Sequence, residues 1–93
     1  MKTNDGSPFP KRLKEARLRK GLSQKQLGIV AGVDPSSASP RMNQYEKGVH
    51  TPDFQMVRAL AKVLEVPTAF LFCEEDALAD QIIEYKSKQC QRP

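Results

Sequence analysis

A short helix with a clear start and a clear stop lies between residues 23 and 32, and this stretch constrains the fold more than any other. Ser23 can accept a hydrogen bond from the backbone N–H of Gln26, whose side chain can reach back to the N–H of Ser23, as in a capping box. Three apolar residues then recur at the i, i+3, i+4 spacing of one helix face: Leu27, Val30 and Ala31. Gly32 can end the helix, because glycine tolerates the positive φ of a tight exit. We therefore predict a helix from Ser23 to Ala31, followed at once by a sharp turn.

A second short helix is predicted after this turn. Met42 and Tyr45 are apolar and three residues apart. The residues around them are polar and point elsewhere: Arg41, Asn43, Gln44 and Lys47. A helix, a tight turn with glycine and a second helix form a helix-turn-helix pattern.

Two prolines make the start of the second helix ambiguous. Asp34-Pro35 resembles a cap followed by a proline in the first helical turn, and Ser39-Pro40 repeats that signature. A proline inside a helix loses one hydrogen bond and clashes with the preceding turn. We therefore predict a short turn at residues 35–38 and a separate helix from Pro40 to Lys47. The alternative is one longer helix that is kinked at Pro40.

Several short motifs in this region are similar to those of one known family. They are Leu-Ser-Gln at 22–24, Leu27, Ala-Gly-Val at 31–33, Glu-Lys-Gly at 46–48, Thr-Pro-Asp-Phe at 51–54 and the apolar stretch at 57–64. Together they resemble the Cro/repressor-type DNA-binding domains, also called the XRE family, over roughly residues 9–72. The resemblance implies an all-α fold, a five-helix repressor-like DNA-binding domain, to which this chain adds a C-terminal helix. It also implies a regulator of transcription that binds double-stranded DNA, with repression as the simplest mechanism.

The resemblance also implies which residues would contact DNA. Counted back from Glu46, the base-reading positions are Ser39, Pro40, Arg41, Asn43 and Gln44, although the segment at 34–40 is longer than is usual in the family. Arginine can bond guanine O6 and N7, and glutamine or asparagine can bond adenine N6 and N7. The positions expected on phosphates are Gln24, Lys25, Lys47, His50 and Thr51, with Gln24 at a helix N-terminus that suits an anion. For each of these residues, an ordinary polar surface position is the alternative. The resemblance further implies a structural ion pair between Arg17 and Glu46.

Positive charge is concentrated in the half of the chain that carries the motif. Residues 1–50 contain ten Lys and Arg against four Asp and Glu, a net charge of +6, whereas residues 51–93 contain five against seven, a net charge of −2. A basic surface of this kind is what contact with phosphates requires. The alternative is a solvated, lysine-rich surface. In the first helix, from Pro10 to Lys20, we expect most of the basic residues to be solvated and only Arg17 to be paired.

Length and composition exclude several other classes of protein. The 93 residues allow one small domain, and no apolar run approaches the ~20 residues of a membrane span. We therefore expect a cytoplasmic protein in which Cys73 and Cys90 are reduced. Without neighbouring histidines these cysteines make no zinc site, and we expect no cofactor and no small-molecule substrate. One histidine, no clustered carboxylates in a predicted cleft and no glycine-rich phosphate loop argue against an enzyme.

The remaining helices are predicted from caps and apolar spacing. The first helix has Phe9, Leu13 and Ala16 on its inner face and stops at Gly21. Asp53 caps a fourth helix whose core stripe is Phe54, Val57, Leu60, Ala61 and Leu64. A fifth helix, Thr68 to Phe72, closes the core with Phe70 and Leu71, and Cys73 packs beside it. We accordingly divide the chain into a flexible arm at 1–8, a DNA-binding domain at 9–73 and a C-terminal helix and tail at 74–93.

A sixth helix of about twelve residues is predicted after the acidic start at 74–76. Its apolar face consists of Leu78, Ala79, Ile82, Ile83 and Tyr85. A helix this short is marginal alone in water, so it must pack either on its own domain or on a second copy. We favour a homodimer, with Leu78, Ile82, Ile83 and Tyr85 as the contact residues. The alternative function is a protein-interaction or antitoxin-like module that uses this helix.

Overall fold

The computed structural model describes residues 6–90, and side chains as far as residue 85. Within that range the chain is all-helical, with α1 at Phe9–Lys20, α2 at Gln24–Val30, α3 at Pro35–Glu46, α4 at Phe54–Leu64, α5 at Thr68–Leu71 and α6 at Asp76–Cys90. The expected all-α fold is confirmed. The flexible arm predicted at 1–8 falls mostly, and the tail of the 74–93 segment partly, outside the described residues. None of the described helices combines the length and the apolar character needed to cross a membrane.

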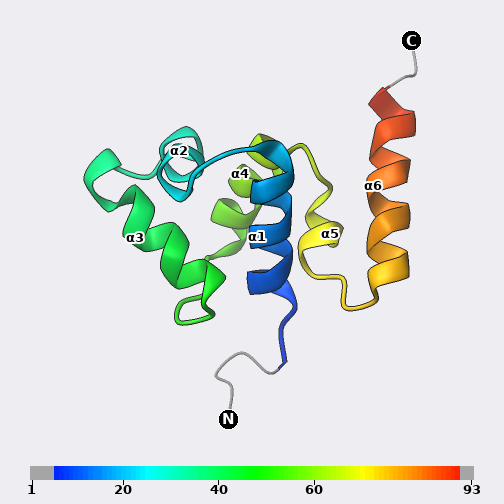
Figure 1. The fold of residues 1–93 in the computed structure, drawn as a ribbon, viewed down its shortest axis with the longest axis horizontal. Coiled ribbons are helices and arrows are strands. Elements are labelled where there is room, and N and C mark those ends of the chain that lie inside the picture. Colours follow the sequence, from blue (N-terminus) through cyan, green and yellow to red (C-terminus); the bar gives the residue numbers. More distant parts are fainter. Residues whose placement is uncertain (1–5, 91–93) are drawn as a thin grey trace.

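α1 stands at the centre of the molecule, with α2 and α3 on one side and α5 and α6 on the other (Figure 1). α4 lies behind it and closes the core. The buried apolar side chains come from the first five helices, the loops between helices and one position of α6. Those that are almost wholly inaccessible include Phe70, Leu13, Leu27, Met42, Leu60, Leu71 and Val57. The DNA-binding elements predicted from sequence therefore share one core with α1 and α4.

The start of α2 is the capping box that the sequence predicted. The backbone N–H of Gln26 donates to Ser23 Oγ at 3.0 Å, and the N–H of Ser23 donates to Gln26 Oε1 at 2.8 Å. At the other end Gly32 adopts φ 105°, and the N–H of Val33 donates to the carbonyl of Gly28 at 2.9 Å. Both signals are local, which explains why the sequence alone was sufficient to find them.

α3 is one continuous helix, so the predicted turn at 35–38 with a separate helix from Pro40 is wrong. The alternative, a longer helix that runs through Pro40, is what the structure has. Asp34 caps the helix by accepting from the N–H of Ser36 at 3.1 Å. Pro40 removes one backbone hydrogen bond. Ala38 and Met42, both fully buried, keep the helix packed on either side of the proline, and this packing outweighs the loss.

Two further sequence predictions are corrected in the structure. Phe54 was placed in the core stripe of α4, but it is 62% exposed, with the guanidinium of Arg58 5.9 Å from its ring centre. As the first residue of α4 it precedes the turn that faces the core. Arg12 was expected to be solvated, but it is only 2% exposed.

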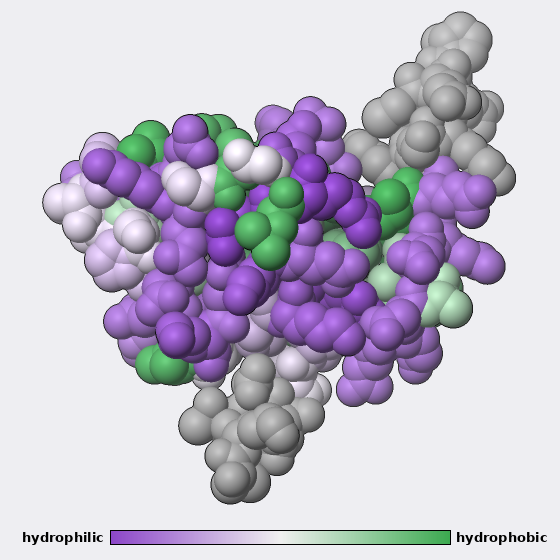
Figure 2. Space-filling view, in the orientation of Figure 1, coloured by the Kyte–Doolittle hydropathy of each residue, from purple (hydrophilic) through white to green (hydrophobic). Residues whose placement is uncertain are grey.

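α6 packs partly on its own domain. Ala79 is buried, and Ile82 and Ile83 are half-buried against the core. Leu78 and Tyr85 remain 49% and 60% exposed. Figure 2 shows apolar residues where α6 meets the rest of the domain, on a face that is otherwise mostly hydrophilic. Intramolecular packing thus accounts for one side of the helix and leaves the other side open.

Candidate nucleic-acid interface

An ion pair joins α1 to the end of α3. Arg17 Nε lies 2.6 Å from Glu46 Oε2, and Arg17 Nη2 lies 3.2 Å from Glu46 Oε1. The two side chains are only 11% and 4% exposed. Arg17 Nη1 also donates to the carbonyl of Leu22 at 2.9 Å, in the loop that leads to α2. The structure therefore brings together the two residues that the sequence paired, and the pair holds α3 in a fixed position relative to α1 and α2.

Gln24 extends this contact to the start of α2. Its Nε2 donates to Glu46 Oε1 at 3.2 Å and to Asn43 Oδ1 at 3.3 Å. The side chain is half-buried between the two helices. Gln24 was expected on a phosphate, but in the structure its amide nitrogen binds residues of α3. Lys25, beside it, is exposed.

A second group of predicted contact residues lines one shallow hollow at the end of α3. This hollow is formed by Arg41, Gln44, Tyr45, His50 and Thr51. The loop after α3 folds back over the helix end, because the N–H groups of Val49 and His50 donate to the carbonyl of Gln44 at 3.0 and 3.4 Å. Two residues expected on bases and two expected on phosphates therefore meet on one surface.

The other predicted residues lie around these two groups. Ser39 is half-buried, whereas Pro40 and Lys47 are exposed. Lys47 ends α3, and Gly48 follows it with φ 75°. Arg41 and Lys47 thus present positive charge on the exposed part of α3, where the helix is open to solvent.

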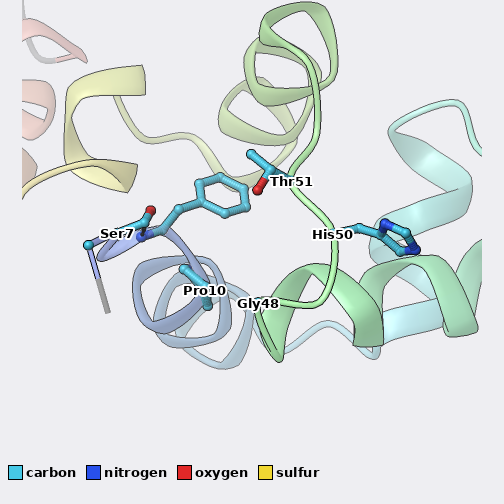
Figure 3. A pocket seen from close by; sticks show the side chains of 7 residues that line it. Ser7, Pro10, Gly48, His50 and Thr51 are labelled. Atoms are coloured by element: carbon cyan, nitrogen blue, oxygen red, sulfur yellow. Dashed lines mark hydrogen bonds between the residues drawn. The ribbon is translucent and has the colours of Figure 1, made fainter. Parts of the chain in front are cut away.

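His50 faces α3 and not the start of α1. A small hollow between the first turn of α1 and the α3–α4 loop is lined by Phe9, Pro10 and Thr51, among others. Figure 3 shows the imidazole of His50 turned away from Pro10 and Thr51. Among the residues with described side chains, no group of three or more His, Cys, Asp or Glu residues could hold a metal ion. The surface beside α3 offers side chains suited to hydrogen bonding and charge contacts, those of Arg41, Gln44, His50 and Thr51.

The buried Arg12 is a structural residue that the sequence analysis missed. Its Nε donates to the carbonyl of Cys73 at 2.8 Å, its Nη2 to Asp76 Oδ1 at 2.8 Å and its Nη1 to Glu15 Oε1 at 3.0 Å. Its guanidinium also lies 5.6 Å from the ring centre of Phe70. The spacing gave a signal, because Arg12 is three residues after Phe9 on the inner face of α1. This arginine joins α1 to the segment that starts α6.

The charges around Arg12 shift two pKa values. Burial acts to lower the pKa of the Arg12 guanidinium, but hydrogen bonds to Asp76 and Glu15 outweigh it and raise that pKa. Hydrogen bonds from Arg12 and Lys11 lower the pKa of the exposed Asp76 carboxyl. This cluster joins α1 to the start of α6, and α6 lies on the other side of α1 from α3 (Figure 1).

The arrangement of α2 and α3 around this ion pair defines a helix-turn-helix protein. A family model described as "Helix-turn-helix" matches residues 13–71, which is more than half of the chain. The chain belongs to this family, which confirms the resemblance to the Cro/repressor type and makes the protein a DNA-binding transcription regulator as a class.

A solved structure gives a second comparison. The chain is similar to the crystal structure of "transcriptional regulator BswR", with 52% sequence identity and a TM-score of 0.82 over 85% of this chain and 78% of that chain. A comparison with curated proteins gives no significant match. The structural likeness extends beyond the family match, since 85% of the chain is more than residues 13–71 contain.

Proposed function

We propose that the protein recognises a specific sequence in duplex DNA by placing α3 in the major groove. The observation that carries this proposal is the common surface formed by Arg41, Gln44, His50 and Thr51. Arg41 and Gln44 carry the donors and acceptors that match guanine and adenine edges. His50 and Thr51 lie beside them, where a phosphate would flank the groove.

Phosphate contacts position the protein in this proposal. Lys25 and Lys47 are exposed, and they follow Gln24 and Glu46 in the sequence, two residues that are in contact with each other. The net charge of +6 over residues 1–50 attracts the DNA backbone as a whole, and such attraction is independent of sequence. Base contacts from α3 then supply the preference for one site. We assign residues 9–73 to this DNA-binding domain, acting in the cytoplasm.

Repression follows from binding without further machinery. A protein that occupies a promoter excludes polymerase from the same DNA, so this mechanism needs only a site of sufficient affinity. The similar structure is that of a transcriptional regulator, which supports a role in transcription and is compatible with either repression or activation. We propose repression because it requires the fewest additional contacts.

We also propose that the functional form is a homodimer. One module of this size covers only a short stretch of DNA, and helix-turn-helix dimers bind two half-sites about one helical turn, ~34 Å, apart. The open side of α6 offers an apolar contact surface, lined by Pro67, Ala69, Leu78, Gln81, Ile82 and Tyr85. A second copy of the chain would cover it and would place two α3 helices on one duplex.

Selection from a pool of random duplexes tests the proposed function. The wild-type chain should enrich one sequence with two-fold symmetry, and Arg41→Ala should alter that sequence. Arg19→Ala is a matched control, because Arg19 is an exposed arginine of α1 whose guanidinium lies over Phe70 and not beside α3. If the wild-type chain enriches no sequence, and instead retains a protein partner, the interaction-module alternative replaces this proposal.

A further inference from the structure

The polar contacts among α1, α2 and α3 impose a direction on every hydrogen bond between them. Glu46 accepts from Arg17 at 2.6 and 3.2 Å and from Gln24 at 3.2 Å. A carboxylate paired with arginine carries acceptors and no donor. The amide of Gln24 must therefore turn its NH₂ group, and not its carbonyl oxygen, toward Glu46.

This orientation determines the orientation of the next amide. The same NH₂ group of Gln24 lies 3.3 Å from Asn43 Oδ1. An amide nitrogen has two hydrogens and accepts nothing, so Asn43 must turn its oxygen toward Gln24. Its Nδ2, with two donors, lies on the other branch of the planar amide and points away from Gln24. The buried ion pair therefore fixes, through Gln24, an amide on α3 that could otherwise rotate by half a turn.

We propose that Gln24 is a positioning residue that makes Asn43 present only hydrogen-bond donors to a base. This inference rests on the proposed function, in which α3 lies in the major groove. A donor-only group selects an edge with acceptors, such as guanine N7 and O6. An asparagine that is free to turn would instead bond adenine N6 and N7 together. We call the two contacts of Gln24, with Glu46 and with Asn43, the relay. The relay thus selects guanine over adenine at the base pair that Asn43 faces.

The same contacts assign Gln24 a different role from the one that the sequence suggested. Both hydrogens of its amide nitrogen are directed at acceptors within the protein, one on Glu46 and one on Asn43. A residue held in this way acts on base preference, whereas a phosphate contact would act on all sequences alike. The two roles therefore predict different results in a binding experiment.

The experiment compares base preference in variants of the full-length chain. Asn43→Ala first identifies the base pair that Asn43 reads, as the position whose preference disappears in selection from random duplexes. Gln24→Met keeps the side-chain length but removes the donor. It should lower the preference for guanine over adenine at that pair by about tenfold and leave the Arg41-dependent pair unchanged. Gln55→Met, at an exposed glutamine of α4, is the matched control and should change neither position.

Two substitutions separate positioning from a merely structural role. Gln24→Lys restores donors to both Glu46 and Asn43, so it should keep the wild-type preference for guanine. Asn43→Asp still accepts from Gln24 but presents an acceptor outward, so the preference should move to cytosine, whose amino group is a donor. Thermal unfolding of each variant shows whether the fold is retained, and Asn43→Asp tests the relay even if Gln24→Met does not fold.

Specific results would overturn the inference. An unchanged preference in Gln24→Met, an equal loss on all duplexes, or a Gln24→Lys chain that behaves like Gln24→Met would each do so. If Asn43→Ala alters no base pair while Arg41→Ala alters one, the inference fails and the proposed function stands. If the wild-type chain enriches no sequence, the proposed function itself fails.

Discussion

Gly28 and Ala38 bring the backbones of α2 and α3 into direct contact. A Cβ atom on Gly28 would lie 2.8 Å from Ala38 Cβ and 3.0 Å from both Ala38 Cα and the Ala38 carbonyl oxygen. Such distances are shorter than packed atoms allow, so only glycine permits this approach of the two helices. Glycine is a weak helix former, and this contact gives the structural reason for its presence inside α2.

Gly28→Ala should therefore destabilise the protein although alanine is the better helix former. Alanine would gain about 1 kcal/mol of helix propensity, but forcing apart two packed helices costs about 1–3 kcal/mol. The overlap involves backbone atoms, which cannot move aside as a flexible side chain can, so we expect a net loss. Urea unfolding measures it. Ala38→Gly in the Gly28→Ala background should recover part of the loss, and a more stable Gly28→Ala chain would contradict this account.

The ion pair between Arg17 and Glu46 leads to a second prediction. Removing one partner leaves the other charge buried, because both side chains are nearly inaccessible. Arg17→Ala or Glu46→Ala should each cost about 3–5 kcal/mol. A double-mutant cycle should show strong coupling between the two sites, and additive losses would contradict a direct interaction. Arg19→Ala, at an exposed arginine of the same helix, should cost much less.

Acid should weaken the contact between Arg12 and Asp76. The pKa of Asp76 is lower in the folded protein than in the unfolded chain, because Arg12 and Lys11 hydrogen-bond its carboxylate. The ionised carboxylate therefore stabilises the fold above the unfolded pKa of about 3.9, and this contribution is lost as the pH falls toward the folded pKa. The pKa of Asp34 is also lowered, by hydrogen bonds from Ser36, so this carboxylate adds to the same loss of stability in acid.

The measurement is the free energy of unfolding between pH 7 and pH 3. Asp76→Asn should lower the free energy of unfolding at neutral pH and make its decline toward acid less steep. The part of the decline that comes from Asp34 should remain. Asp80→Asn changes an exposed carboxylate of the same helix and serves as the control. A decline that is equally steep in Asp76→Asn and in the wild-type chain would show that this contact does not contribute.

Local signals made half of the recognition motif predictable, and long-range packing decided the rest. The capping box at Ser23 and the turn at Gly32 depend on neighbours within five residues. The course of α3 through Pro40 depends on Ala38 meeting Gly28 of another helix, and proline rules alone favoured a break. Arg12 was missed because its main partner, Asp76, is 64 residues away in the sequence.

The contacts of the site residues also depend mostly on long-range packing, which local sequence patterns do not show. Arg17 and Glu46 were paired through a family resemblance, and the hollow that joins Arg41 to His50 depends on how the loop after α3 folds back. Gln24 was expected at a phosphate because it starts a helix. Its contact with Asn43 crosses from α2 to α3, and no local pattern in the sequence indicates it.

Arg41 and Lys47 should affect DNA binding in different ways. Arg41→Ala should lose about 1–3 kcal/mol on the preferred duplex and flatten the preference at one base pair, expected to be G·C. Lys47→Ala should weaken all duplexes about equally and reduce the slope of log affinity against log salt by about 1. Titrations of preferred and random duplexes at several salt concentrations measure both. A wild-type slope near zero would contradict binding through the phosphate backbone.

The last prediction concerns the open side of α6. Leu78 and Tyr85 are exposed, whereas Ala79 is buried and Asp76 binds Arg12. Removing the whole helix would therefore disturb the core as well as any dimer, so substitution of the two exposed residues is the sharper test.

The Leu78→Ser, Tyr85→Ser double variant should keep the unfolding temperature and lose the dimer, because only apolar area between copies is removed. Sedimentation at micromolar concentration should show a wild-type dimer and a monomeric variant, which would bind a single half-site weakly. Gln81→Ser, on the same surface but without an apolar side chain, should remain dimeric. A monomeric wild-type chain would contradict the prediction and would assign α6 to the intramolecular core alone.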